Sequence, residues 1–385
     1  MLTGPALTRF RKRLLTWFAE FQRDLPWRRT KDPYRIWLSE IMLQQTRVAA
    51  AIPYYERFLE RFPDVGTLAN APEEDVLRHW SGLGYYSRAR NLQKAARQIV
   101  AEHNSQFPNS EDAALALAGI GAYTAAAILS IAYGKKLAVL DGNVARVIAR
   151  LGAIRGDLRT GSRWQRLQEE ADQLLAPGAP GDWNQAMMEL GATLCTPRSP
   201  QCLLCPVTEF CEARKSGLVD VLPEKRNKRE GVDVTLAALV LVDPKRRTLL
   251  LPPPPKSKDK LATTHDVAAL LSRMWHFPTI QVREDAPGEL RSFFKKAIFP
   301  GKKFVARLEA LPKVRHTVTY RNITVLPFRC EMATLPRVSH AKVLPLDHLS
   351  DVPVSNLTRK VAFAAMPHSG PNRGITKESE VNLRF

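Results

Sequence analysis

The sequence contains no run of about 18 apolar residues, so it predicts no membrane-spanning helix. Acidic residues are scarce: 38 Asp and Glu stand against 57 Lys and Arg, which leaves a formal net charge of +19. This surplus favours a polyanionic partner, although a merely basic surface would have the same composition. Residues 1–18 carry charges within an amphipathic pattern, which is typical of a helix and not of a signal peptide. We therefore expect an intracellular protein.

Cysteine is also rare, with five residues in 385, and four of them lie between positions 195 and 211. In a reducing compartment such a group indicates a metal or iron–sulfur site more than disulfides. The spacing differs from the two separated Cys-x2-Cys pairs of a zinc ribbon. One tetrahedral metal ion and one [4Fe–4S] cube both remain compatible with four thiolates on a short loop. The candidate ligands are Cys195, Cys202, Cys205 and Cys211.

The chain is too long for one ordinary core, and its character changes near residue 218. Residues 1–217 have helical periodicity, 218–230 form a charged linker, 231–366 an α+β domain and 367–385 a disordered tail. The expected helices are 36–50, 54–61, 73–80, 89–104, 111–117, 123–133, 144–151, 164–175 and 183–194. In the second domain we expect strands at 232–242, 248–251, 304–311, 317–330 and 341–344, and a helix at 267–272.

Two short motifs in the helical part are candidates for anion binding and catalysis. Gly119 and Gly121 separate two apolar helices, where free backbone N–H groups could bind a phosphate. Taken alone, this pattern is more often a plain tight turn. Asp141 begins the next helix twenty residues later, and an isolated Asp there is usually an N-cap.

Glu40 lies in a stretch that is otherwise apolar or amide. A carboxyl in such surroundings should have a raised pKa and could carry a proton at neutral pH. The alternative is a surface Glu paired with Arg47, and the helix face alone does not decide between them.

Taken together, these motifs resemble the helix-hairpin-helix superfamily of endonuclease III-type DNA glycosylases, whose cluster loop has the cysteine spacing found here. The segments 25–28, 37–46, 82–91 and 184–191 resemble the adenine DNA glycosylase (MutY) family. The similarity extends over residues 7–363, more loosely in the C-terminal part. Ala118 stands where the family hairpin commonly has proline, which loosens the turn without removing its donors.

The resemblance implies a role for each candidate residue and a [4Fe–4S] cofactor on the four cysteines. Glu40 would protonate the adenine, and Asp141 would stabilise the cationic sugar. The supporting positions are Tyr123, Asn143, Trp27 and Arg28. The residues that would enter or contact the DNA are Gln45, Leu83, Tyr85, Gly119 and Gly121, although Leu83 and Tyr85 could equally form a packed turn.

The C-terminal domain resembles the Nudix-like (MutT-like) domain of the same family, with residues 274–278 as its clearest match. It has no acidic Nudix motif, so it should not bind Mg²⁺ or hydrolyse nucleotides. The resemblance places recognition of the opposite base, 8-oxoguanine, at Val318, Thr319 and Tyr320. There the family has Phe-Ser-His, so a hydroxyl is kept and two rings are altered. A core strand that touches no base is the alternative.

The sequence is therefore interpreted as a monofunctional enzyme of base excision repair, acting on adenine paired with 8-oxoguanine or guanine. Tyr123 replaces the lysine nucleophile of endonuclease III, which argues against a glycosylase/lyase. A non-enzymatic iron–sulfur DNA-binding or redox-sensing protein would need neither Glu40 nor Asp141. We expect a monomer that binds mispaired duplex DNA, nucleoid-associated in the cytoplasm if the source is bacterial.

Overall fold

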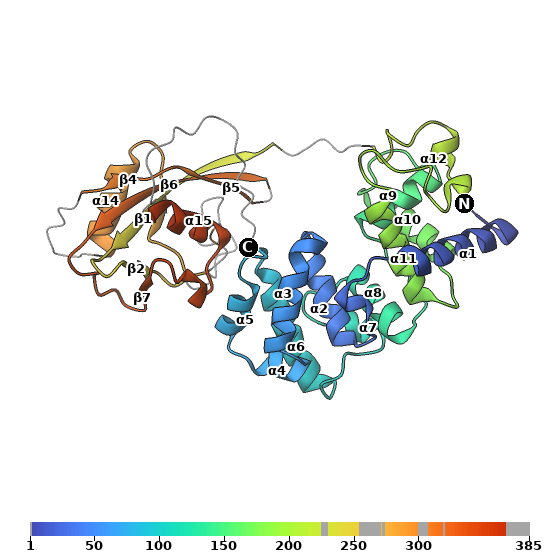
Figure 1. The fold of residues 1–385 in the computed structure, drawn as a ribbon, viewed down its shortest axis with the longest axis horizontal. Coiled ribbons are helices and arrows are strands. Elements are labelled where there is room, and N and C mark those ends of the chain that lie inside the picture. Colours follow the sequence, from blue (N-terminus) through green and yellow to red (C-terminus); the bar gives the residue numbers. More distant parts are fainter. Residues whose placement is uncertain are drawn as a thin grey trace. The chain divides into compact units, whose positions relative to one another are not determined.

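Two units make up the chain in the computed structural model, residues 1–230 and residues 231–385 (Figure 1). The structure describes residues 2–224, 230–253, 271, 274–298, 307–318 and 320–366. The first unit is helical, and the second combines strands with helices. This agrees with the predicted fold class of a mainly helical domain followed by an α+β domain.

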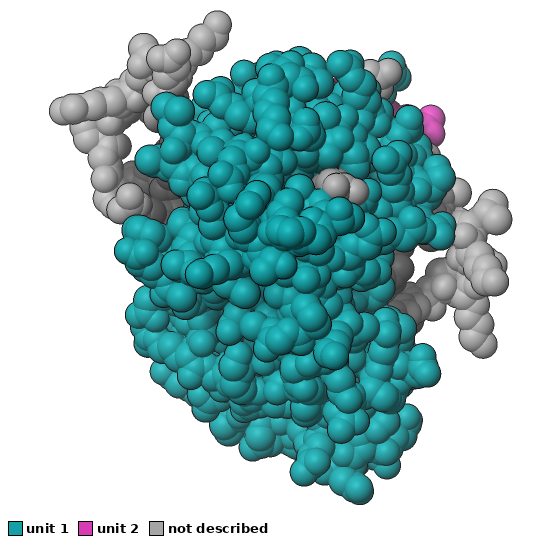
Figure 2. All heavy atoms as spheres, turned by 90° about the vertical axis from the view of Figure 1, so that its right-hand side faces the viewer, with its two compact units in different colours: residues 1–230 teal, residues 231–385 magenta. Residues whose placement is uncertain are grey.

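Unit 1 consists of helices joined by short loops, and its side chains form one continuous surface on the face in Figure 2. No described helix is long and apolar enough to cross a membrane. The elements are α1 (Gly4–Phe21), η1 (Pro26–Arg28), α2 (Pro33–Leu43), α3 (Val48–Arg61), α4 (Val65–Asn70), α5 (Glu73–Trp80), α6 (Ser87–Glu102), α7 (Glu111–Leu115), α8 (Ala122–Tyr133), α9 (Gly142–Leu151), α10 (Gly161–Leu174), α11 (Pro180–Thr193), η2 (Thr208–Phe210) and α12 (Glu212–Lys215).

The helices of unit 1 form two lobes. Helices α2 to α8 make one lobe, in which α2 packs on α3, α6 and α8. Helices α1 and α9 to α12 make the other, where α11 packs against α1 and α9 (Figure 1). Helix α11 also contacts α8, which joins the lobes. Its Gly191 lies so close to α9 that an added Cβ would be 2.7 Å from the Asn143 Cβ.

The predicted helix boundaries around residue 45 are wrong. Instead of a helix at 36–50 and another at 54–61, the chain breaks after Leu43 and then runs through Pro53 in a single helix, α3. Pro53 lies in the second turn of α3, where it removes one helical hydrogen bond without ending the helix. The break coincides with Gln45, whose φ of +60° cannot continue a helix.

The charged segment after the cysteines is partly packed against unit 1. Val219 and Leu222 are buried in a small apolar cluster with Ala213, and Leu218 packs against that cluster. The apolar residues at the start of the predicted linker therefore extend the fold of the cysteine loop. Residues 225–229 lie outside the described residues.

Unit 2 contains a five-stranded sheet and a separate two-stranded ribbon. In the sheet β3, β1, β6 and β4 are neighbours in that order, with β5 also paired to β6. Strands β1 and β6 are parallel, and the other pairs are antiparallel. The elements are β1 (Val232–Val242), β2 (Arg247–Leu250), β3 (Thr279–Gln281), α14 (Ala286–Ala297), β4 (Glu309–Ala310), β5 (Val314–Val318), β6 (Arg321–Glu331), β7 (Lys342–Pro345), η3 (Leu349–Asp351) and α15 (Asn356–Ala365).

Strand β1 has apolar residues on both faces. Even-numbered residues, from Val234 to Val242, share a core with α15, whereas Ala237, Leu239 and Leu241 share one with α14. Because successive side chains of a strand point to opposite faces, the continuous apolar run indicates a sheet covered on both sides.

Several predictions for unit 2 need correction. The strand predicted at 317–330 corresponds to two antiparallel strands, β5, which ends at Val318, and β6, which begins at Arg321. Helices α14 and α15 were not predicted, and their periodicity is short and interrupted by polar residues. The predicted helix 267–272, residues 304–306 of a predicted strand and the tail 367–385 lie outside the described residues, apart from Leu271.

Candidate active site

A cavity of about 630 Å³ lies where the two lobes of unit 1 meet. Its lining combines residues from η1, α2, α8, α9 and α11, which are far apart in the sequence. Every predicted catalytic or supporting residue is among them, as is one predicted DNA-contacting residue: Trp27, Arg28, Glu40, Gln45, Tyr123, Asp141 and Asn143.

Glu40 is buried on α2, with 6% of its surface exposed. The pKa of Glu40 is raised to about 7, mainly by burial; the Tyr123 hydrogen bond opposes this increase, the nearby Asp141 adds to it and Arg28 opposes it. The alternative of a surface carboxyl paired with Arg47 is therefore wrong. A carboxyl with this pKa carries a proton for a substantial part of the time at neutral pH.

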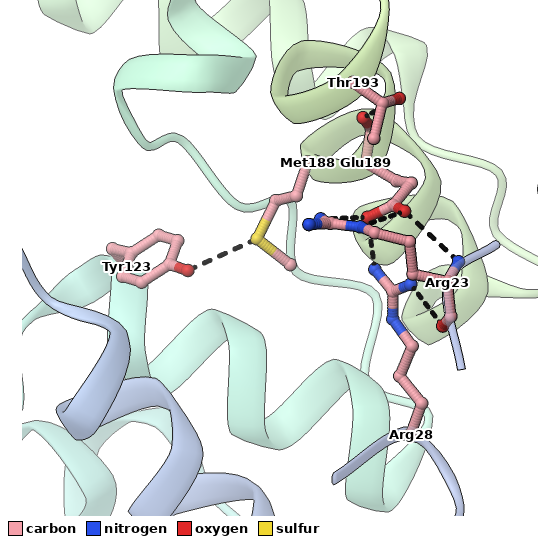
Figure 3. A network of polar contacts seen from close by, with 6 residues as sticks. All are labelled: Arg23, Arg28, Tyr123, Met188, Glu189 and Thr193. Carbon is pink, nitrogen blue, oxygen red and sulfur yellow. Dashed lines mark hydrogen bonds and ion pairs between the residues drawn. The ribbon is translucent and has the colours of Figure 1, made fainter. Parts of the chain in front are cut away.

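Tyr123 lies in the first turn of α8 and contacts two side chains across the cavity. Its hydroxyl lies 2.6 Å from Glu40 Oε2. The same hydroxyl lies 3.2 Å from the Met188 sulfur (Figure 3). One hydroxyl hydrogen serves one acceptor at a time, and the shorter contact to an oxygen is the stronger bond. The phenol therefore donates to Oε2, which leaves the proton of a neutral Glu40 to Oε1.

Asp141 is the N-cap of α9 and also lines the cavity. Its Oδ1 accepts from the N–H groups of Asn143 (2.9 Å) and Val144 (2.7 Å), and its Oδ2 accepts from Asn143 Nδ2 (2.9 Å). Burial raises its pKa, although these amide donors act against the shift. Asp141 is therefore an N-cap, as one interpretation predicted, and the capping hydrogen bonds hold its carboxyl at the cavity wall.

Asn143 is held in place from its other side. Its Oδ1 accepts from Arg146 Nη2 (2.8 Å), and Arg146 Nε donates to the carbonyl of Cys195 (2.8 Å). A continuous chain of hydrogen bonds therefore joins the Asp141 carboxyl to the first cysteine of the cysteine loop.

An ion cluster of Arg23, Arg28 and Glu189 also lines the cavity (Figure 3). Glu189 of α11 accepts two hydrogen bonds from the Arg23 guanidinium and one from Arg28 Nη2, each at 2.7 Å. Burial favours the neutral acid, but these hydrogen bonds prevail and lower the pKa of Glu189 to about 2. Trp27, beside Arg28, is buried and packs edge-on against Tyr55. The cavity lining therefore includes Glu40, whose carboxyl is partly protonated at neutral pH, and Glu189, whose carboxyl is ionised.

The two loops that carry the predicted wedge residues have unusual backbone conformations. Gln45 and Tyr85 have φ values of +60° and +49°, in the left-handed region that most non-glycine residues avoid. Tyr85 is 41% exposed, and Leu83 is buried. Packing thus accounts for Leu83 in this structure, whereas the side chains of Gln45 and Tyr85 are accessible.

The predicted hairpin lies between α7 and α8, with both of its glycines exposed. Gly119 has φ +77°, and a Cβ there would be 2.7 Å from the Asn91 Cβ, so only glycine fits. Gly121 is the N-cap of α8 and has open space around it. The amides at the start of α8 thus lie on the surface, as an anion site requires.

The four clustered cysteines fit an iron–sulfur cluster better than a single ion. Burial raises the pKa of Cys205 to about 12, with smaller increases from Cys195, Cys211 and Cys202, so the thiols are near one another. Yet no group of three or more His, Cys, Asp or Glu residues in the described ranges could hold one metal ion. A [4Fe–4S] cube has iron at four alternate corners, each bound by one thiolate, so its four ligands lie farther apart than the ligands of a single ion. Arg150 Nη1, 3.3 Å from the Cys195 sulfur, supplies a donor that suits a bound thiolate.

The residues predicted to read the opposite base lie at the junction of β5 and β6. Val318 ends β5 and packs against the core that includes Val314. Tyr320 is 38% exposed, with the Arg321 guanidinium 4.9 Å from its ring centre. Thr319 lies outside the described residues. The predicted strand 317–330 is thus divided between β5 and β6, and a role of these residues in reading a base stays a prediction.

Two family models match the sequence of unit 1. Residues 38–173 match the HhH-GPD superfamily of base excision DNA repair proteins, and residues 195–211 match the iron–sulfur binding domain of endonuclease III. The second match starts and ends at the outer cysteines. Cys195, Cys202, Cys205 and Cys211 therefore form a [4Fe–4S]-binding segment, as predicted.

Among curated proteins, the adenine DNA glycosylase of Schizosaccharomyces pombe is 33% identical over 349 residues, covering 77% of this chain and 75% of the yeast protein. The chain belongs to the adenine DNA glycosylase family. Unit 1 supplies 230 of the 385 residues, so this alignment of an adenine glycosylase extends well into unit 2.

Other members of the adenine glycosylase family match with higher identity over shorter stretches. The human enzyme is 47% identical over 218 residues, which is 54% of this chain and 40% of the human one. The Arabidopsis thaliana enzyme is 40% identical over 316 residues, covering 74% of this chain and 49% of the plant protein. The chain spans less than half the length of the human, rat and mouse relatives.

A solved structure supports the fold of unit 1 in this adenine glycosylase family member. A thermostable thymine-DNA glycosylase is 30% identical, with a TM-score of 0.51 over 55% of this chain and 97% of that one. Its substrate, as named, differs from that of the adenine glycosylases, so the fold alone does not choose the base.

The sequence motifs alone indicated no role for Glu189 or Arg88. Both lie inside motifs that were recognised, but their partners are distant in sequence. Glu189 pairs with Arg23 and Arg28, more than 160 positions away. The available signal was the charge itself, because an unpaired Glu or Arg between apolar helix positions is costly.

Proposed function

We propose that this protein is a monofunctional DNA glycosylase that hydrolyses the N-glycosidic bond of adenine opposite 8-oxoguanine or guanine. The observation that carries the proposal is the placement of Glu40 and Asp141, with different surroundings, in one cavity. Adenine leaves readily only after its ring is protonated, and the sugar then becomes cationic. One carboxyl must donate a proton, and another must remain ionised.

Glu40 is assigned as the acid and Asp141 as the electrostatic stabiliser. Glu40 is buried and has one strong hydrogen bond to its carboxyl, from Tyr123, so its neutral form is accessible near pH 7. Asp141 accepts three amide hydrogen bonds, which favour its charged form. The difference in hydrogen bonding supports this order of roles, with Tyr123 and Asn143 holding the two carboxyls in place.

The pocket walls suit a flipped, neutral purine. Trp27 offers an apolar surface, and the Arg28–Glu189 pair offers fixed donors and acceptors at the cavity wall. A base held in this way must first leave the duplex, at a cost of a few kcal/mol. We assign Gln45, Leu83 and Tyr85 to the segment that enters the duplex, and the hairpin amides at Gly119 and Gly121 to a backbone phosphate.

Duplex DNA is the proposed partner, bound by a monomer. The formal charge of +19 supports a polyanion, and the cavity lies between the two lobes, one of which carries both the hairpin and the wedge loops. DNA affinity should therefore fall steeply as salt rises, because bound phosphates release counterions. Recognition of 8-oxoguanine is assigned to Val318, Thr319 and Tyr320.

A single-turnover excision assay tests the proposal directly. Duplexes containing A:8-oxoguanine, A:G, A:T and T:G are incubated with excess protein, and each sample is analysed with and without hot alkali. We expect strand breaks in the first two duplexes only after alkali. Breaks without alkali would indicate a glycosylase/lyase, and cleavage of T:G alone would indicate thymine excision. Binding without any cleavage would indicate a DNA-binding protein.

A further inference from the structure

Arg88, in the first turn of α6, has a buried guanidinium that contacts two separate loops. The contacts of Nη1 are with the carbonyl oxygens of Ile41, Met42 and Gln44, at 2.5–2.9 Å. Those of Nη2 are with Thr46 Oγ1 and the carbonyl oxygens of Leu83 and Gly84, at 3.2–3.3 Å. Nη1 thus binds the C-terminal end of α2, whereas Nη2 binds both Thr46, just after α2, and the loop before α6.

This position is costly for an arginine. A cation in the first turn of a helix opposes the helix dipole, and burial lowers the pKa of Arg88 to about 10. The compensation lies in the oxygens that it contacts. Ile41 and Met42 are in the last turn of α2, where carbonyls have no helical partner, so Arg88 caps α2 from a different helix. A planar fork can satisfy several carbonyls in two directions, whereas a lysine ammonium is a single point.

The two loops joined by Arg88 carry the two left-handed residues, Gln45 and Tyr85. Each such residue is sparsely populated in a free chain and persists where surrounding contacts determine it. Arg88 contacts the residues on both sides of Gln45, and its guanidinium lies 5.6 Å from the Tyr85 ring centre. The same guanidinium lies 5.4 Å from the Trp80 ring centre.

We propose that Arg88 is a positioning residue that locks the Gln45 loop and the Leu83–Tyr85 loop into one rigid wedge. The two loops then enter the duplex together and hold the target base out of the stack. Arg88 does not line the cavity, so it acts on extrusion through the loops and not on the reacting atoms. The inference rests on the proposed function, because it concerns the step that brings the base into that cavity.

The first test compares a normal duplex with a loosened one. Excision of adenine is measured in single turnover for an A:8-oxoguanine duplex and for the same duplex with mismatches on both sides, which lower the cost of extrusion. We expect Arg88→Gln to lose about tenfold or more in rate on the normal duplex and less than threefold on the loosened duplex. A merely structural role would reduce both rates equally.

Gln93→Leu is the matched control. Gln93 is buried on the same helix and donates to the carbonyls of Leu68 and Ala71, away from the wedge loops. This variant should lower the melting temperature and leave the ratio of the two rates at the wild-type value.

The second test observes extrusion without chemistry. In a Glu40→Gln background, which prevents excision, a duplex with 2-aminopurine opposite guanine becomes more fluorescent as the base leaves the stack. We expect this increase at saturating protein, a strong loss of it on adding Arg88→Gln, and its retention on adding Gln93→Leu.

Equal losses on both duplexes, or an unchanged fluorescence increase with Arg88→Gln, would overturn the inference. If Arg88→Gln does not fold, Arg88→Lys is measured instead. Its ammonium cannot reach both loops, so the same selective loss on the normal duplex is expected, and an unchanged ratio would be decisive against the inference. Failure of the proposed function has a different signature, because wild-type protein would then excise adenine from neither duplex.

Discussion

The Tyr123 hydroxyl lies 2.6 Å from Glu40 Oε2, so a helix from the far side of the hairpin fixes the carboxyl of α2. This contact lowers the pKa of Glu40 against the larger effect of burial, and the result lies near 7. The phenol thereby holds the carboxyl in one orientation and keeps its proton exchangeable at neutral pH. A lysine at this position would lower the pKa of Glu40 further, because a full positive charge favours the carboxylate more strongly than a neutral hydroxyl does.

Glu40→Gln should abolish adenine excision and leave DNA binding nearly unchanged. The amide has the same shape and can still accept from Tyr123, but it cannot transfer a proton to the leaving base. Excision is followed in single turnover, and binding by a gel-shift titration, with the exposed Glu209→Gln as control. A variant that cleaves at the wild-type rate would show that Glu40 is not the acid.

Tyr123→Phe should shift the pH dependence of excision to higher pH. The wild-type rate should fall as pH rises through about 7, where Glu40 loses its proton. Removing the phenol removes a hydrogen bond that favours the carboxylate, so the pKa of Glu40 rises and the fall occurs at higher pH. The measurement is a single-turnover rate profile from pH 5 to 9. A shift toward lower pH would contradict the assigned contact.

Glu40→Gln should also stabilise the fold, but only at higher pH. The pKa of Glu40 is raised from 4.5 to about 7 in the folded protein, a difference of about 2.5. Wild-type stability is therefore unaffected below pH 4.5 and decreases as pH rises to about 7, by up to about 3 kcal/mol. The variant should melt at the wild-type temperature at pH 4.5 and above it at pH 8. An equal difference at both values would exclude Glu40 as the titrating group.

The purified protein should be brown, because four cysteine thiolates hold an iron–sulfur cluster. Cys202→Ser should weaken DNA binding more than it slows excision at saturating protein, since the cysteine loop lies outside the cavity lining. Iron and zinc analysis accompanies both measurements. A colourless protein with one zinc per chain would contradict the cluster assignment.

Thr319→Ala should reduce the preference for A:8-oxoguanine over A:G. A hydroxyl can accept a hydrogen bond from the extra ring N–H of 8-oxoguanine, and one such bond is worth roughly 0.5–1.5 kcal/mol, or about two- to thirteen-fold. The affinity ratio for the two duplexes is measured for wild type, Thr319→Ala and the exposed Thr317→Ala. An unchanged ratio in Thr319→Ala would assign discrimination to another part of the chain.

The sequence predicted most of the candidate site because the relevant residues are conspicuous locally. Glu40 stands out among apolar residues, Asp141 precedes a strongly amphipathic helix, and four cysteines occupy 17 positions. Each of these signals is contained in a short window. Asp141 caps α9 and also lines the cavity, so the capping interpretation is confirmed and the catalytic one stays a prediction.

Long-range contacts could not be predicted in the same way. The break after Leu43 depends on carbonyls that Arg88 satisfies from more than 40 positions away. The end of β5 and the start of β6 lie within a run that reads as a single strand, because no glycine or proline stands between Val318 and Arg321. In each case the deciding partner is absent from the local pattern.

The position of α11 against α9 depends on Gly191, whose missing side chain leaves room for Asn143. Replacing Gly191 with alanine would raise the helix propensity of α11, but the added Cβ would push α11 and α9 apart. Asn143, Asp141 and the loop that begins at Cys195 would then move together, because hydrogen bonds connect them. A single added methyl group would thus displace residues of the candidate active site and of the cysteine loop at the same time. Inherited or selected loss of activity in this family member could therefore arise at a residue that touches neither substrate nor iron.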